Sequence, residues 1–225
     1  MNGPTSCRDD VRLAFREWLT AGGSRVGEVV IRAAGSGYIL THWRDADADP
    51  ATLERFTRPE DARELARFGG DGAYRPLKTA PNLRRGWRLE LSGFDALCLA
   101  VGFFYPAALG VAAARREGRL RVVPLRETLE RQSGMYAVTR KISDAGAEAA
   151  IARCCRSPGG GCLKTILWEI GAVGGRSGPE NANASGENPS FFPLLCNEAC
   201  NLLVAAIRKS LKSPPESPPG PLPDR

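Results

Sequence analysis

The chain has 225 residues, a formal net charge of +6 at neutral pH, 43% hydrophobic residues and a single histidine. This length suits one large domain or two small ones, and the composition excludes a globally disordered or fibrous protein. The charge is low for a dedicated nucleic-acid binder, and one histidine excludes zinc or chelatase sites that need a histidine pair.

Residues 1–12 lack the charged and then apolar layout of a signal peptide, so we expect a cytoplasmic protein. The chain contains seven cysteines. In a reducing compartment they favour metal binding, catalysis or burial over a disulfide framework.

The first 145 residues mix helical and strand patterns. Residues 8–20 place apolar side chains on one helical stripe, while 26–31 and 38–43 flank a Gly-Ser-Gly turn typical of a β-hairpin. The later patterns predict a helix over 57–68, a strand over 87–91, a helix over 106–117, a strand over 120–123 and a helical turn over 127–132. Together they predict an α+β fold.

Residues 96–114 carry no charge and would be flagged as a membrane span by a hydropathy window. Tyr105-Pro106 interrupts the stretch near its centre. We therefore interpret it as two buried segments that meet at a turn, with a membrane span as the less favoured alternative.

The composition changes near residue 147. A helix is predicted over 144–155, an apolar run over 163–170, a flexible loop over 171–190 and an amphipathic helix from Asn197 to about Leu211. We expect a mixed α+β domain over 1–147, a small, mainly helical, cysteine-ligated domain over 148–210, and a disordered Pro-rich tail over 211–225.

Five cysteines form two clusters in this C-terminal part. The first cluster is Cys154-Cys155-x6-Cys162, and the second, Cys196-x3-Cys200, is expected to place both sulfurs on one face of a helix start. Free N–H groups there favour thiolate over thiol.

Several thiolates brought together repel one another, so such a grouping indicates a metal centre. The irregular spacing favours a [4Fe–4S] cluster, zinc is the alternative cofactor, and simple burial is the remaining interpretation. Cys7 and Cys98 lie away from both clusters and are not expected to be ligands.

The residues also resemble a known family. LCNEACNLLVAAIRK (195–209) and CLKTILW (162–168) resemble the iron–sulfur C-terminal module attached to CbiX-type sirohydrochlorin cobaltochelatases. YRPLKTAPNLRRGW (74–87), FYPAALG (104–110) and RQSGMY (131–136) resemble the stabilising domain of that family. The resemblance covers roughly 25–208 and implies a [4Fe–4S] cluster packed against the stabilising domain.

The resemblance also implies the ligands. Cys162, Cys196 and Cys200 match ligand positions, and Cys155 is preferred over Cys154 as the fourth because it is closer to the turn before Cys162. The chelatase domain of the family has no counterpart here, so we expect no catalytic residues and no catalysis by this chain alone. His42 is interpreted as a surface or half-buried residue, not a ligand.

A basic stretch with interleaved aromatic residues lies between 74 and 88. Its candidate anion-binding residues are Arg75, Lys78, Arg84, Arg85, Trp87 and Arg88. Such a patch suits the carboxylates of a sirohydrochlorin-like tetrapyrrole, with Trp87 stacking on the macrocycle, or the phosphates of single-stranded nucleic acid. The simplest interpretation is a solvated loop whose aromatic residues anchor it to the core.

The leading hypothesis is an iron–sulfur accessory protein of sirohydrochlorin, cobalamin or sirohaem metal chelation that works with a separate CbiX-type chelatase subunit. The alternative is a zinc-stapled module that binds nucleic acid through residues 75–88, although nucleic acid is not the expected partner. A redox enzyme is disfavoured because the sequence has no flavin or nicotinamide fingerprint.

Overall fold

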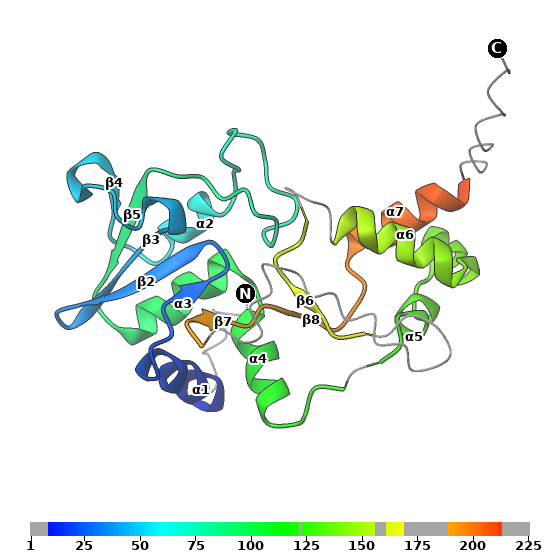
Figure 1. Ribbon diagram of the computed structural model, residues 1–225, viewed down its shortest axis with the longest axis horizontal. Coiled ribbons are helices and arrows are strands. Elements are labelled where there is room, and N and C mark those ends of the chain that lie inside the picture. Colours follow the sequence, from blue (N-terminus) through cyan, green and yellow to red (C-terminus); the bar gives the residue numbers. More distant parts are fainter. Residues whose placement is uncertain (1–8, 122, 156–160, 169–188, 213–225) are drawn as a thin grey trace, which may run out of the picture.

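The computed structural model describes residues 9–121, 123–155, 161–168 and 189–212 (Figure 1). It begins with helix α1 (Asp9–Thr20), whose first turn carries Asp9 and Asp10. Acidic side chains at this end interact favourably with the helix dipole. Val11 and Phe15 are buried, which confirms the apolar stripe predicted for residues 8–20.

The main sheet has six strands. They are β1 (Arg25–Val26), β2 (Val29–Ala34), β3 (Gly37–His42), β4 (Glu54–Phe56), β5 (Trp87–Leu91) and β7 (Phe191–Phe192), in the spatial order β4-β5-β3-β2-β1-β7. The predicted hairpin is confirmed, since β2 and β3 pair antiparallel with Ala34 opposite Gly37. The two outermost pairs, β4–β5 and β1–β7, are parallel.

The strand predicted over 26–31 is divided by a tight turn at Gly27 and Glu28, across which Val26 pairs with Val29. Gly27 has φ +56°, and a Cβ there would lie 2.5 Å from the ring of Tyr105. Only glycine fits this close approach. The turn matters because it places the Glu28 side chain inside the protein, where it is 4% exposed.

Helices cover one face of the sheet. Helix α3 (Phe94–Phe104) packs against β3 and β5, and α4 (Ala108–Arg116) packs against α1. The predicted alternation of β5 is confirmed, because Trp87, Leu89 and Leu91 all point into the first core. The short helix α2 (Asp61–Leu65) replaces the longer helix predicted over 57–68, since residues 68 and 69 instead form bridges to residues 74 and 83.

The uncharged stretch 96–114 folds as two helices, as predicted. Helices α3 and α4 are bent by 103° at a break that contains Pro106 and the left-handed Ala107. No single helix in the described ranges is long and apolar enough to cross a membrane, and the bent pair passes such a test by length and composition only.

A second, smaller core lies beside the first (Figure 1). Its elements are α5 (Leu125–Glu130), the 3₁₀ helix η3 (Gly134–Lys141), α6 (Asp144–Cys154), the two parallel strands β6 (Thr165–Ile166) and β8 (Leu195–Cys196), and α7 (Asn201–Lys212). Helix α6 is capped by Ser143, whose side chain accepts from the Gly146 N–H.

The mixture of strands and helices along the described chain confirms the predicted α+β class.

One expectation about this region was wrong. Residues 120, 121 and 123 lie outside any strand, and the helical segment that follows begins at Leu125, directly after Pro124. Leu125 and Leu129 pack with Ile151 in the second core, and the expected domain boundary at 147 stays a prediction. Residues 171–188 of the predicted loop and 213–225 of the predicted tail lie outside the described residues, while α7 continues to Lys212.

The two cores interleave along the chain. After contributing α6 and β6 to the second core, the chain returns to the main sheet, where β7 pairs with β1 and Phe192 packs in the first core. It then crosses back to form β8 and α7. Residues 190–194 therefore tie the two cores together.

Candidate metal centre

Three segments of the second core carry the five candidate cysteines. Cys154 and Cys155 lie at the end of α6, Cys162 lies in the segment before β6, and Cys196 and Cys200 flank the turn from β8 to α7. Cys98 is buried in α3 within the first core, as expected for a residue that is not a ligand, and Cys7 lies outside the described residues.

Cys155 is at the centre of the grouping. It caps the C terminus of α6, with its N–H donating to the Ile151 carbonyl and its own carbonyl accepting from the Cys162 N–H at 3.1 Å. Burial, with a smaller contribution from repulsion by the other four thiols, raises the pKa of the Cys155 thiol to about 12. The other four sulfurs therefore lie within electrostatic range of the Cys155 sulfur. Cys154 is less buried, and burial also raises its pKa.

The predicted placement of Cys196 and Cys200 on one helical face is wrong. Cys196 lies in β8, paired with Ile166, and its sulfur lies 3.1 Å from the Glu198 carbonyl oxygen. Helix α7 begins only at Asn201, so Cys200 is the residue before its first turn and its carbonyl accepts from the Val204 N–H. Strand and turn, rather than a helix, bring the two sulfurs toward Cys155.

Cys162 contacts the N-terminal region. Its sulfur lies 3.2 Å from Oγ1 of Thr79, and the next residue, Leu163, donates its N–H to the Thr79 carbonyl at 2.6 Å. Thr79 is only 6% exposed and belongs to the loop between α2 and β5. The sequence contained no local signal for this contact, because the two residues are far apart in the chain.

Trp168 is a second residue that the sequence did not single out. It is 3% exposed within the second core, and its indole Nε1 has no hydrogen-bond partner among the described residues. The neighbouring Leu167 N–H donates to the Cys196 carbonyl at 2.8 Å. Burial raises the pKa of the Cys196 thiol, whereas the Glu198 backbone, Lys164 and the Trp168 indole each favour its thiolate.

This chemistry fits an iron–sulfur cluster. Soft thiolates are the ligands of such clusters, and donors directed at sulfur stabilise the thiolate charge. Within the part of the chain that the structure describes, no three His, Cys, Asp or Glu side chains are grouped so as to hold one metal ion. The assignment of Cys155, Cys162, Cys196 and Cys200 as ligands, with Cys154 as the alternative to Cys155, stays a prediction.

The basic stretch is largely engaged within the protein. Arg75 is 2% exposed, donates to Asn82 and to the carbonyls of residues 78 and 80, and lies 3.6 Å from the Glu28 carboxylate. Lys78 donates to the Phe103 carbonyl, while Arg84, Arg85 and Arg88 pair with Glu54, Asp45 and Glu90.

Trp87 is unavailable to a ligand in this conformation. It is fully buried, stacks on Phe104 with ring centroids 5.3 Å apart, and donates to the Arg84 carbonyl. The proposed stacking of Trp87 on a macrocycle is therefore wrong, and the indole anchors the loop instead. Anion binding by the exposed arginines stays a prediction.

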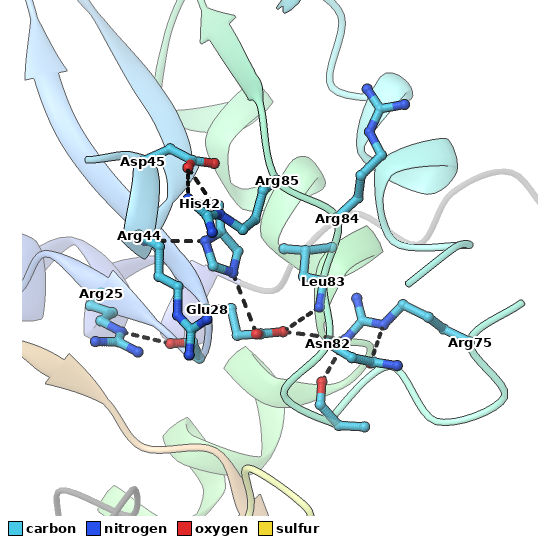
Figure 2. Close-up of polar contacts among 12 residues, drawn as sticks. Arg25, Glu28, His42, Arg44, Asp45, Arg75, Asn82, Leu83, Arg84 and Arg85 are labelled. Carbon is cyan, nitrogen blue, oxygen red and sulfur yellow. Dashed lines mark hydrogen bonds and ion pairs between the residues drawn. The ribbon is translucent and has the colours of Figure 1, made fainter. Parts of the chain in front are cut away.

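A buried polar cluster surrounds Glu28 (Figure 2). Its carboxylate accepts from the Leu83 N–H at 2.8 Å and lies 3.5 Å from His42 Nε2, while the Glu28 N–H donates to the Tyr105 hydroxyl. His42 is 2% exposed, so its expected surface or half-buried position is corrected. Together with Arg75, Glu28 fixes the loop that carries Thr79.

Comparison with known proteins matches two consecutive segments of the chain to different families. Residues 11–117 match the family model described as the DR2241 stabilising domain, and residues 117–209 match a model described as a 4Fe-4S iron-sulfur cluster binding domain. A search among curated proteins gave no match.

One solved structure is similar over most of the chain. The crystal structure of DR2241 from Deinococcus radiodurans matches with a TM-score of 0.73 and 31% sequence identity, over 90% of this chain and 41% of that one. DR2241 is described as a multi-domain protein with structural similarity to chelatases and with two additional novel domains. The present chain therefore spans less than half the length of this relative.

Proposed function

We propose that the protein binds a [4Fe–4S] cluster through Cys155, Cys162, Cys196 and Cys200 and acts as an accessory to metal chelation into a sirohydrochlorin-type tetrapyrrole by a partner chelatase. The observation that carries the cluster is the convergence of the thiols on buried Cys155. The match of residues 117–209 to a 4Fe-4S binding domain supports it independently.

When bound, such a cluster supplies reversible one-electron transfer and a cross-link between its ligand segments. The chain's own residues prepare the site. The C terminus of α6 presents Cys155, β8 presents Cys196, and Cys200 directly precedes the first turn of α7. Four cysteine ligands occupy every iron and leave no position for Lewis-acid chemistry.

The link to chelation rests on the architecture of the relative. DR2241 combines counterparts of both parts of this chain with structural similarity to chelatases. We infer that this chain supplies an iron–sulfur function to a chelatase and leaves metal insertion to that partner.

Anaerobic purification tests the cluster. The wild-type protein should be brown, with about four irons per chain, as a four-cysteine cubane requires. Serine substitutions at Cys162, Cys196 and Cys200 should each lower the iron content and bleach the visible absorption. Within the adjacent pair, Cys155→Ser should lose iron, whereas Cys154→Ser is the matched control that should keep it.

Two outcomes would contradict the proposal. A colourless protein that contains zinc would replace the cofactor, and full iron content in a Cys196→Ser, Cys200→Ser double variant would remove these ligands. The chelation role is tested separately, by adding the purified protein to a CbiX-type chelatase and measuring Co²⁺ insertion into sirohydrochlorin. An unchanged insertion rate would contradict that role and leave the cluster in place.

A further inference from the structure

Two buried hydrogen-bond donors lie against proposed ligand cysteines, one from each core. Trp168 belongs to the second core and Thr79 to the loop that the Glu28–Arg75 cluster fixes on the first. Neither residue is a metal ligand by chemical type. Both are more than nine-tenths buried, so their polar atoms must find partners within the protein rather than in the solvent.

The indole of Trp168 is the more informative of the two. Buried indole N–H groups normally donate a hydrogen bond, because leaving the donor without an acceptor is costly. Here Nε1 has no such acceptor among the described residues. The Leu167 N–H donates to the Cys196 carbonyl, and the indole of the next residue, Trp168, lies close enough to the Cys196 thiol to favour its thiolate.

Thr79 makes the equivalent contact with another cysteine. Its Oγ1 lies 3.2 Å from the Cys162 sulfur, within hydrogen-bond range for a sulfur partner. A hydroxyl rotates to suit its partner, so it donates once the cysteine is a thiolate. The loop around Thr79 is held by Arg75, which donates to the carbonyls of residues 78 and 80 on either side.

We propose that Trp168 Nε1–H and Thr79 Oγ1–H donate hydrogen bonds to the Cys196 and Cys162 thiolates of the bound cluster and raise its reduction potential. The inference rests on the proposed function. Reduction adds a negative charge that the cluster shares with its thiolate ligands, and a donor at sulfur stabilises the reduced state more than the oxidised state. Trp168 and Thr79 are positioning residues, since they act through the cysteines.

The inference also gives the first core a direct role at the cluster. Because Thr79 is supplied by the first core, the electron affinity of the cluster depends on how the two cores are docked. A conformational change in the loop between α2 and β5 would then alter the reduction potential of the cluster through Cys162, without any change in the four ligands.

The test is a redox titration of anaerobically purified protein, followed by visible absorption and electron paramagnetic resonance. Trp168→Phe keeps the ring and removes the donor, and Thr79→Val keeps the shape and removes the hydroxyl. Each should lower the ratio of reduced to oxidised cluster at a fixed solution potential by about threefold to tenfold, where tenfold corresponds to about 59 mV for one electron. The double variant should show the larger shift.

Matched controls make the same substitutions far from the cluster. Trp43→Phe removes an indole N–H from a residue that is 38% exposed, and Thr52→Val removes a surface hydroxyl that donates to the Asp49 carbonyl. Both should leave the potential unchanged. Thermal denaturation of each variant separates a lost donor from a damaged fold.

A second readout does not require reduction of the cluster. In resonance Raman spectra, the iron–thiolate stretching bands of the wild-type protein should shift on transfer to D₂O, and the double variant should lose most of that shift. If the Trp168 and Thr79 variants had the same reduction potentials and isotope shifts as the wild-type protein, this inference would be overturned, while the cluster proposal would stand. A wild-type protein without iron–sulfur absorption would instead overturn the proposed function itself.

Discussion

The two cores of this protein are stabilised in different ways. The first is rich in aromatic side chains, with Phe15 contacting Trp18, Phe94 and Phe192 at centroid distances of 5.5, 5.9 and 5.3 Å. The second contains several alanines and a single buried aromatic residue, Trp168, in its described part. Apolar burial dominates the first core, whereas four other thiols lie around the buried Cys155 of the second. We expect this small core to depend on metal ligation to stay folded.

Removal of iron should therefore produce the largest difference between the cores. We expect chelation of the iron without denaturant to unfold residues 125–155, 161–168 and 195–212, because repelling thiolates and little buried apolar area then remain. Limited proteolysis with mass spectrometry should show rapid cleavage there and protection of residues 9–113. Equal protection of both regions in the iron-free protein would contradict this comparison.

The next largest effect is expected at the buried Arg75. Arg75→Met leaves the Glu28 carboxylate, which is 5% exposed, without its arginine. Removing one partner of a buried pair lowers the free energy of unfolding by about 3–5 kcal/mol. Chemical denaturation of the first core should show this loss, and Glu28→Gln in the same background should recover part of it. No recovery would mean that packing of the arginine stem, not its charge, stabilises the loop.

Phe192 tests whether the two cores are stabilised independently, because a C-terminal segment supplies this residue to the first core. It contacts Phe15 and also Trp18, with ring centroids 5.1 Å apart in the latter pair. Phe192→Ala should destabilise the first core by about 3 kcal/mol, at the low end for a buried phenylalanine because its site is near the sheet edge. Iron content should stay at the wild-type level. Loss of iron would show that β7 also positions β8.

The smallest expected effect is at the sheet surface. The Arg55 guanidinium bonds to Glu90, and this hydrogen bond holds the pKa of the Glu90 carboxyl below its ordinary value of 4.5. The stabilisation is complete above pH 4.5 and disappears as the pH falls through the lowered folded-state pKa. Arg55→Gln should slightly lower Tm at pH 7, and the difference from wild type should shrink as the pH falls below 4.5. A difference that stays constant with pH would contradict an electrostatic origin.

Local patterns predicted the elements whose burial is set by their own sequence. The stripe of α1, the alternation of β5 and the break at Tyr105-Pro106 all appear in the structure as expected. The cysteine clusters were identified by spacing, and residues 117–209 match an iron–sulfur binding domain. The α+β class followed from the same patterns.

What could not be predicted depends on contacts between distant residues. The two-residue strand β7 has no periodicity of its own and forms because β1 offers it an edge. Cys196 lies in a strand, although its x3 spacing to Cys200 is typical of a helix, because β6 pairs with it. Thr79, Trp168 and Glu28 are ordinary residues in the sequence, and only the fold makes them neighbours of a cysteine or an arginine.

The parallel pairing of β7 with β1 has a consequence for synthesis of the chain. Residues 190–192 reach the ribosome exit long after α1 and β1, yet Ser190 accepts the N–H groups of residues 24 and 25, and Pro189 accepts from the Trp18 indole. Until then, the outer edge of β1 is an open strand edge beside uncovered Phe15 and Trp18, the kind of surface that invites pairing with another chain. Arg25 in β1 places a charge on that short edge. The nascent protein is therefore most exposed to aggregation just before β7 is synthesised.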